Sequence, residues 1–273
     1  KQTRLAFVET IGNPALDVPD IRALATITRQ ANIPLVVDNT VATPILIRPG
    51  QLGADIVVHS TSKFINGHGT AIGGAIVDTG NFNWSAGPFD DIRKSSAQTR
   101  QLAFLAHLRN LICRDLGGCP SPTNSHLMLQ GLETLPLRMA RHCANAQLLA
   151  AMLSEHPEVS WVNYPGLAGG RYADRVLSQF GGLGGGLLTF SLGSAERAYR
   201  FIRALKLAKN LANLGDAKTL VIHPASTIFH EFDCVEQGKM GVTADMIRVS
   251  VGIEDVDDIQ EDFQQAIEES GGV

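Results

Sequence analysis

A lysine stands among hydroxyl side chains in the segment His59–His68, directly after an apolar run. A lysine at the carboxyl end of a parallel strand lies where open α/β sheets bind ligands. In an apolar site its ammonium is costly, so its pKa falls and the neutral amine becomes available for Schiff-base chemistry. Ser60 and Ser62 offer hydroxyl donors for a phosphate. Lys63 is therefore a candidate catalytic residue, although a surface-loop lysine among small polar residues would give the same pattern.

An aspartate ends the apolar run that precedes this segment. Asp38 closes Leu35–Asp38, and adjacent parallel strands would deliver Asp38 and Lys63 to the same sheet edge. An aspartate there can pair with the protonated pyridine nitrogen of pyridoxal phosphate and keep the ring an electron sink. A strand-ending aspartate can also simply cap the next segment. Lysine, aspartate and paired hydroxyls together favour pyridoxal 5'-phosphate as the cofactor.

Short apolar runs that alternate with helical patterns must position these residues. Such runs are typical of parallel strands that are covered on both faces. Four runs are predicted strands: Leu5–Glu9, Leu35–Asp38, Ala54–His59 and Ala71–Val77. A helix is expected from Asp17, with Pro19 in its first turn, and residues 80–96 are expected to form a loop. The alternation predicts an α/β domain with a mostly parallel sheet.

The second half of the chain indicates a smaller α+β unit. A helix opens at Ser121 and runs with interruptions to about His156. After it we expect strands at 159–162, 187–192, 219–222 and 247–251, and helices at 172–179, 195–205 and 257–268. These strands alternate more between apolar and polar residues, which predicts a sheet with one exposed face. We therefore predict two domains, residues 1–144 and residues 145–273.

Composition narrows the class of protein. With 273 residues, of which 44% are hydrophobic and 18% charged, the chain can bury a core, which excludes a disordered chain. A net charge of -4 gives no sign of binding to nucleic acid or to an anionic membrane. No apolar run approaches the ~20 residues that span a bilayer, and no secretory signal pattern is visible. The four cysteines show no CxxC spacing, so we expect reduced thiols and a cytoplasmic protein.

Two further patterns invite functional interpretations that their context opposes. Gly181–Gly186 precedes a strand instead of joining a strand to a helix, so we expect a flexible connector and not a phosphate-binding loop. The eight histidines include no HExxH pair and no cluster with cysteine, so no metal site is predicted. The histidines of the helical middle are expected to be surface or capping residues: His107, His126, His142 and His156.

Motifs over essentially the whole chain resemble the Cys/Met-metabolism family of pyridoxal-phosphate enzymes. The central signature of that family is matched, in order, by Val37–Thr40, Gly53–Lys63, Asn66–His68 and Ile72–Gly74. The family includes cystathionine γ-synthase and methionine γ-lyase, but the resemblance is greatest to its O-acetylhomoserine sulfhydrylases. Supporting segments are Asn81–Trp84, Leu129–Leu135, Trp161–Leu167, Asn213–Leu220 and His223–Ser226. The resemblance implies an aspartate-aminotransferase-like (fold type I) large domain followed by a smaller α+β domain.

The resemblance also assigns roles in cofactor binding. By this resemblance, Lys63 would hold the cofactor as a Schiff base and then carry protons, and Asp38 would hold the pyridine nitrogen. Ser60 and Ser62 would bind the phosphate; the family more often has threonine at the position of Ser62, which keeps the hydroxyl. Asn13 sits where the family's asparagine contacts the cofactor and the substrate carboxylate, although an Asn-Pro turn alone would look the same.

Substrate recognition falls, by the same resemblance, mainly on Arg248. The family motif implies that Arg248 is a bidentate carboxylate clamp, although an arginine in a strand is often a structural salt-bridge partner. Asn213 stands where lyases of the family usually carry serine and sulfhydrylases asparagine, which favours a sulfhydrylase. In two places the sequence departs from the family: His230 is shifted by one position, and residues 87–103 do not match the usual longer stretch.

The residues and the resemblance together imply a pyridoxal-phosphate-dependent transferase. It would replace the γ-substituent of O-acetyl-L-homoserine with sulfide or a thiol, giving acetate and homocysteine or another methionine precursor. A methionine γ-lyase or cystathionine γ-synthase with the same apparatus is a second interpretation. A third is a truncated, non-catalytic chain, because family members are longer and carry an N-terminal segment that this sequence lacks. A homodimer or homotetramer is expected, since family active sites are shared between subunits.

Overall fold

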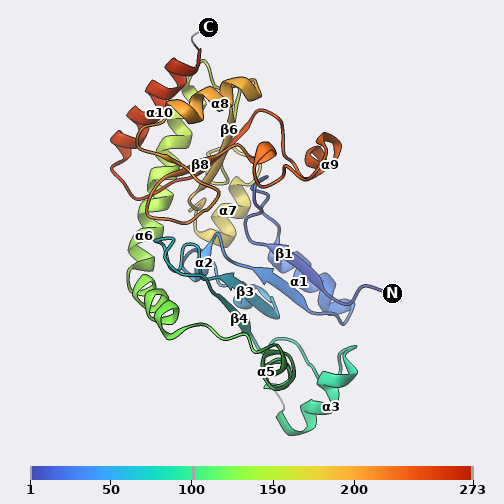
Figure 1. The fold of residues 1–273 in the computed structure, drawn as a ribbon. Coiled ribbons are helices and arrows are strands. Elements are labelled where there is room, and N and C mark those ends of the chain that lie inside the picture. Colours follow the sequence, from blue (N-terminus) through green and yellow to red (C-terminus); the bar gives the residue numbers. More distant parts are fainter. Residues whose placement is uncertain (1, 100–101, 272–273) are drawn as a thin grey trace.

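The strands form two sheets, and one long helix packs against both of them in succession. The computed structural model describes residues 2–99 and 102–271. A four-stranded sheet has the order β1-β2-β3-β4, and a five-stranded sheet has the order β5-β6-β9-β8-β7. In Figure 1 the helix α6 (Pro122–Glu155) runs alongside both sheets, which places its first half against the four-stranded sheet and its second half against the other.

The four-stranded sheet carries the segments in which the sequence placed the lysine and the aspartate. Its strands are β1 (Ala6–Glu9), β2 (Leu35–Asp38), β3 (Ile56–Ser60) and β4 (Gly74–Asp78). The first three are parallel, as predicted, whereas β4 pairs antiparallel with β3. The short chain between β3 and β4 turns back at the same sheet edge, and it has no crossover helix that would return it in the parallel direction. The sheet is therefore mixed at one edge.

Short helices connect these strands. They are α1 (Ile21–Gln30), α2 (Thr43–Leu46) and the 3₁₀ turn η1 (Pro49–Leu52). The helix expected from Asp17 begins later, because the side chain of Asp20 accepts a hydrogen bond from the amide of Ala23 (3.0 Å) and caps α1. The residues before Asp20 thus form a loop that is open to contacts with other parts of the chain.

The region between the sheet and α6 contains one helix that the sequence did not predict. The expected loop at 80–96 ends early, because α3 (Asp90–Thr99) begins inside it with Asp90 and Asp91 in its first turn, where carboxylates are favoured. Next come α4 (Ala103–His107), a π-helical turn η3 (Leu108–Cys113) and α5 (Arg114–Leu116). Trp84 stacks on Phe104 with 4.8 Å between ring centroids, so this region packs on the sheet face of Val36 and Ile56.

Helix α6 joins the two hydrophobic cores. Pro122 occupies its first turn, and the side chain of Ser121 caps it by accepting from the amide of Asn124 (3.1 Å). Leu135, Met139 and Cys143 belong to the first core, and the buried residues from Ala146 onward belong to the second. Within residues 2–99 and 102–271, no helix is both long and apolar enough to cross a membrane.

The second half of the chain folds around the five-stranded sheet. Its strands are β5 (Trp161–Asn163), β6 (Leu187–Ser191), β7 (Lys209–Asn210), β8 (Leu220–Ile222) and β9 (Met246–Ser250). Its helices are α7 (Ala173–Phe180), α8 (Ala195–Ala204), the 3₁₀ turn η4 (Pro224–Ser226), α9 (Cys234–Lys239) and α10 (Val256–Gly271). The strands and helices predicted here are confirmed to within a few residues, while β7 and α9 were not anticipated.

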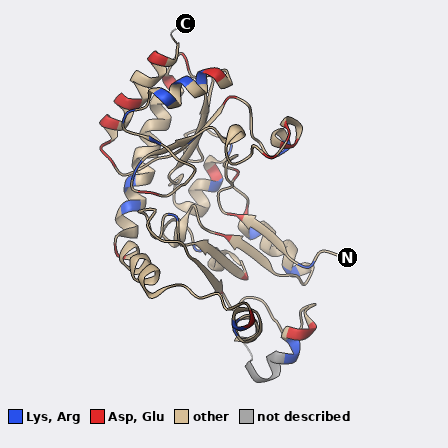
Figure 2. Cartoon of the chain, in the orientation of Figure 1, with Lys and Arg blue, Asp and Glu red and all other residues tan. Residues whose placement is uncertain are grey.

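The prediction that one face of this sheet is exposed is wrong. Every residue of β6 and β9 is buried. One face, with Phe190 and Val249, packs on α6, α8 and α10, whose acidic residues other than the buried Asp262 point to solvent and are red in Figure 2. The opposite face carries the polar residues Thr189, Ser191, Arg248 and Ser250. The polar alternation thus marks a buried functional face and not a solvated one.

The division into residues 1–144 and 145–273 stays a prediction. The two cores meet on α6 between Cys143 and Ala146, close to that boundary. However, Tyr172, Val176 and Phe180 at and within α7 pack into the first core, so one helix from the second half covers the first sheet. A measurement of separate folding units would decide where the boundary lies.

Candidate active site

The parallel strands bring two carboxylates and a hydroxyl to one edge of the four-stranded sheet. Glu9 and Asp38 end β1 and β2 and are register partners, and Ser60 ends β3. Thr40 fixes this edge: its amide donates to Asp38 Oδ1 (2.9 Å), and its hydroxyl accepts from the amide of Ser60 (2.8 Å). Together with Asn13, these residues line a cavity of about 130 Å³. The predicted grouping of Asp38, Ser60 and Asn13 is therefore present in the structure.

Lys63 lies in the tight turn that follows β3. Its amide donates to the carbonyl of Ser60 (3.3 Å), and its side-chain Nζ donates to Asn213 Oδ1 (2.5 Å). Burial lowers the pKa of Lys63, and the positive charge of Arg248 lowers it further. The pKa of Lys63 is thus shifted in the direction that the sequence analysis expected of a lysine that forms Schiff bases.

A buried arginine on α6, Arg138, holds the turn that contains Lys63 by hydrogen bonds. Arg138 is 4% exposed, and its guanidinium donates to the carbonyls of Phe64 (2.6 Å) and Ile65 (3.2 Å), directly after Lys63. It also donates to the carbonyl of Gly131 (2.6 Å) and, through Nε, to Thr134 Oγ1 (3.0 Å). At Gly131 a β-carbon would stand 2.3 Å from the carbonyl oxygen of Ile65, so only glycine lets the turn approach the helix this closely.

Arg248 reaches the same site from β9 of the other sheet. It is 3% exposed, and burial lowers its pKa to about 10. Nη1 donates to Asn13 Oδ1 (3.0 Å) and Nη2 to the carbonyl of Asn213 (2.8 Å), while Nε has no partner among the described residues. Among the ion pairs of the described residues, none includes Arg248. The structure therefore excludes the salt-bridge interpretation within the described chain, and it leaves a buried cation that lacks an anion.

Hydrogen bonds connect four of the predicted residues in one chain. Lys63 contacts the side chain of Asn213, whose carbonyl contacts Arg248, which in turn contacts the side chain of Asn13. These residues come from segments that are far apart in the sequence, on both sheets. The chain of contacts joins the amine that would bear the chemistry to the cation that would hold an anionic group.

Ser62 is placed less simply than predicted. Its hydroxyl donates to the carbonyl of Gly73 (3.2 Å) and accepts from the amide of Gly73 (2.9 Å), so both roles of the oxygen are used within the protein. Within the described part of the chain, the hydroxyl of Ser60 forms no hydrogen bond. The hydroxyl pair expected for a phosphate therefore consists of one uncommitted group and one that closes the turn between β3 and β4.

Two residues of the site, the half-buried Glu9 and the buried Arg138, carried no signal in the sequence, and a third was misplaced. Glu9 and Arg138 have no motif of their own; only the strand-end position of Glu9, and the position of Arg138 two helical turns after Gly131, hint at them. His142 was expected at the surface but is fully buried on α6, where its ring meets Phe64 edge-on (5.1 Å). Burial lowers the pKa of His142 to about 4, so it stays neutral and Nδ1 bonds the carbonyl of Val251 (2.6 Å). The helical spacing of Leu135, Met139 and Cys143 could have placed it in the core.

The remaining sequence candidates lie outside this arrangement. His230 is exposed and bonds the carbonyl of Thr227 (2.7 Å), so the shifted histidine stays in its own turn. Gly181–Gly186 forms the expected connector between α7 and β6, but Gly184 and Gly186 also pack closely, against Gly166 and against Phe64 and His142. All four cysteines are unpaired, as predicted. Within the described residues, no three His, Cys, Asp or Glu side chains could together hold a metal ion.

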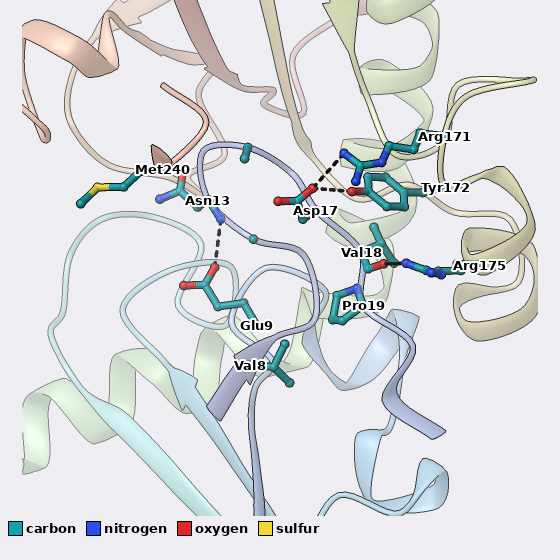
Figure 3. A pocket seen from close by; sticks show the side chains of 12 residues that line it. Val8, Glu9, Asn13, Asp17, Val18, Pro19, Arg171, Tyr172, Arg175 and Met240 are labelled. Carbon is teal, nitrogen blue, oxygen red and sulfur yellow. Dashed lines mark hydrogen bonds and ion pairs between the residues drawn. The ribbon is translucent and has the colours of Figure 1, made fainter. Parts of the chain in front are cut away.

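A larger cavity of about 460 Å³ adjoins the site and is shown in Figure 3. Glu9 and Asn13 line both cavities and stand between them. On the far wall, Asp17 accepts from the hydroxyl of Tyr172 and pairs with Arg171 (3.6 Å). The site therefore adjoins a cavity in which Asp17 is already bonded to neighbouring side chains, whereas Glu9 has no ion pair among the described residues.

The donor set fits pyridoxal 5'-phosphate. Lys63 supplies an amine with a lowered pKa, Asp38 supplies a carboxylate in a small cavity, and Ser60 supplies a hydroxyl at the same strand edge. Arg248 adds a buried cation that has no carboxylate partner in the described part of the chain. An amino-acid substrate would bring the missing anion, so the residues present suit both the cofactor and its class of substrate.

Comparison with known proteins agrees with this geometry. The profile of the family described as Cys/Met metabolism PLP-dependent enzyme matches residues 1–268. An O-acetyl-L-homoserine sulfhydrylase of Leptospira meyeri is 44% identical over 97% of this chain and 64% of its own length. The chain thus spans less than two thirds of the length of that relative.

Two solved structures share the fold. The O-acetylhomoserine sulfhydrylase of Wolinella succinogenes has a TM-score of 0.86 and 40% identity, covering 98% of this chain and 72% of that one. A Campylobacter jejuni protein described as an O-acetylhomoserine (thiol)-lyase carries an N'-pyridoxyl-lysine-5'-monophosphate residue, and it has a TM-score of 0.90 and 35% identity over 97% of this chain and 66% of that one. The predicted α/β fold class is confirmed, and the chain belongs to the Cys/Met metabolism PLP-dependent enzyme family.

Proposed function

We propose that this chain binds pyridoxal 5'-phosphate and takes part in a γ-replacement on O-acetyl-L-homoserine. In that reaction sulfide or a thiol forms a C–S bond at Cγ while the C–O bond to acetate breaks, giving homocysteine or a related thioether. The relatives named above support this substrate class. The hydrogen-bonded chain from Lys63 through Asn213 and Arg248 to Asn13 is the observation that carries the proposal.

Each residue of that chain has a separate task. Arg248 holds the substrate carboxylate, because its buried guanidinium has an unpaired Nε and no carboxylate partner in the described residues. Asn213 Oδ1 orients Lys63 Nζ, and the neutral amine then takes the proton from the substrate Cα. Because Arg248 is buried, water is excluded from the place where its guanidinium would hold the substrate carboxylate. When bound, the cofactor supplies the electron sink for the charge that this proton transfer leaves on Cα.

The remaining residues would hold the pyridine nitrogen and the phosphate of the cofactor. Asp38 holds the proton of the pyridine nitrogen, and the Thr40 amide keeps its carboxylate oriented. Ser60 donates to the phosphate, and Ser62 closes the turn to Gly73 unless its hydroxyl rotates. Asn13 contacts Arg248 and lines the cofactor cavity, which suits a residue that touches both the cofactor and the substrate carboxylate.

We propose that the working form of the protein is a cytoplasmic homodimer or homotetramer.

A single substitution tests the proposal. Lys63→Ala should remove the visible absorbance of the bound cofactor and lower homocysteine formation from O-acetyl-L-homoserine plus sulfide at least ~1,000-fold. Lys206→Ala, which changes only an exposed lysine paired with Glu269, is the matched control. An unchanged absorbance in Lys63→Ala would refute the assignment.

The same assay separates the neighbouring activities. Release of 2-oxobutanoate from methionine would indicate a γ-lyase, and use of cysteine as the sulfur donor would indicate a cystathionine γ-synthase. The position of Asn213 against Lys63 Nζ supports the sulfhydrylase, since this is where the family's lyases would place a shorter serine. We therefore expect homocysteine formation to exceed both other reactions.

A further inference from the structure

Glu9 is a carboxylate in the site to which the proposed function gives no task. It ends β1 beside Asp38, and it lines both the 130 Å³ cavity and the 460 Å³ cavity. Burial raises the pKa of Glu9, the amide of Asn13 lowers it, and the neighbouring charge of Asp38 raises it. A second carboxylate beside Asp38 is electrostatically unfavourable, so its presence calls for a compensating role.

The contacts of Glu9 extend the chain of hydrogen bonds by one step. Glu9 Oε2 accepts from the backbone amide of Asn13 (3.0 Å), a contact that Figure 3 shows as a dashed line. Asn13 Oδ1 then accepts from Arg248 Nη1 (3.0 Å). Asn13 lies in the loop between β1 and α1, whereas Glu9 is held by the β1–β2 ladder. Glu9 thus fastens a loop residue to the sheet at the point where that residue meets the second sheet.

The indirect contact has a chemical advantage. A carboxylate placed directly on Arg248 would form a salt bridge and would compete with an anionic ligand for the guanidinium. The side-chain amide of Asn13 is neutral, so it orients Arg248 without cancelling its charge. Glu9 bonds the backbone amide of Asn13, and the side chain of Asn13 bonds Arg248. Asn13 therefore stands between the negative charge of Glu9 and the guanidinium.

We propose that Glu9 is a positioning residue for the carboxylate of the substrate. It fixes the backbone of Asn13, and Asn13 in turn holds Arg248 so that an unpaired edge of the guanidinium faces the ligand. The inference rests on the proposed function, because it takes Arg248 as the carboxylate clamp. Glu9 itself touches neither the substrate nor the reacting atoms.

Substitutions that keep or remove the acceptor of Glu9 test this role in the cofactor-loaded enzyme. Glu9→Ala should raise the KM for O-acetyl-L-homoserine about tenfold while kcat changes less than about threefold, since the carboxylate is held equally in the ground state and the transition state. Glu9→Gln should recover most of the affinity, because its amide oxygen still accepts from Asn13. Where Glu9→Ala fails to fold, Glu9→Asp, whose shorter side chain withdraws the acceptor, should show the same rise.

A second readout does not depend on turnover. The acid 4-hydroxybutanoate has a carboxylate but no amine, so its competitive binding reports the carboxylate site alone. Its dissociation constant, measured by calorimetry, should rise about tenfold in Glu9→Ala, with the visible absorbance of the bound cofactor unchanged. Asp17→Asn is the matched control, because it removes a carboxylate from the same outer cavity that bonds Tyr172 and not Asn13.

The outcomes separate this inference from the function on which it rests. If Arg248→Lys binds 4-hydroxybutanoate as tightly as the unsubstituted enzyme, the proposed function fails and the inference fails with it. If Arg248→Lys weakens binding but Glu9→Ala does not, only the role of Glu9 is refuted. Equal defects in Glu9→Ala and Glu9→Gln would also refute it, since the charge beside Asp38 would then matter and not the bond to Asn13.

Discussion

Two buried arginines reach the candidate active site from opposite sides, and their surroundings differ in one respect. Arg138, on α6, is 4% exposed and uses Nε and both terminal nitrogens on protein acceptors. Arg248, on β9, is 3% exposed and, among the residues that the structure describes, has two such bonds with Nε unpaired. Within the described chain neither has a carboxylate partner.

The difference separates structure from binding. A buried guanidinium in which every nitrogen already donates to a carbonyl or a hydroxyl, as in Arg138, fastens the chain in place. A buried guanidinium with an unpaired donor is costly unless an anion arrives. Arg138 therefore stabilises the turn that contains Lys63, whereas the unpaired donor of Arg248 supports its proposed role in holding a carboxylate. Burial alone would not have told them apart.

The largest expected effect concerns stability on the Arg138 side. Arg138→Met should lower the free energy of unfolding by about 3–5 kcal/mol, because the carbonyls of Phe64, Ile65 and Gly131 lose their shared donor while buried. Urea denaturation of the apo protein measures this loss. Arg141→Met, on an exposed position of the same helix, should change the free energy by less than about 0.5 kcal/mol. Equal stability of the two variants would contradict the assignment of Arg138 as a clamp.

The next effect concerns binding on the Arg248 side. Arg248→Lys should lower kcat/KM for O-acetyl-L-homoserine about 100-fold, or about 2.8 kcal/mol, because an ammonium cannot hold a carboxylate in bidentate fashion. Its free energy of unfolding should change by less than about 1 kcal/mol, since no ion pair of the described residues is broken. The control is Arg203→Lys on the exposed side of α8. A loss of stability with normal kinetics would make the two arginines alike.

The smallest effect is a shift in the titration of Lys63. Arg248 helps to lower the pKa of Lys63, second to burial, so Arg248→Gln should raise that pKa toward its usual value of 10.5. With more ammonium at a given pH, the pH profile of Lys63 acetylation in the apo protein should move to higher pH. Mass spectrometry of the Lys63 peptide measures the profile, and Arg203→Gln serves as the control. A profile that moves to lower pH would show that Arg248 does not act on Lys63 through its charge.

Local patterns in the sequence determined most of the elements. Apolar runs predicted β1, β2 and β3, and helical spacing predicted α6, α8 and α10, because these signals depend on residues close together in the chain. The helix predicted from Asp17, with Pro19 in its first turn, begins later as α1, because the side chain of Asp20 caps the helix and Ile21 is its first residue. The antiparallel direction of β4 was not predicted, because strand direction depends on where the intervening turn lies in space.

For the site, residue types and motif order indicated Lys63, Asp38, Arg248 and Asn213, and thereby the class of cofactor. Only the tertiary structure decided which donors remain unpaired. It showed that Arg138 is a clamp, that Ser62 is occupied by Gly73 and that Glu9 holds Asn13. The reason is physical: residue types follow from the sequence, but the charge state and the unused hydrogen bonds of a side chain depend on burial and on neighbours brought from other segments.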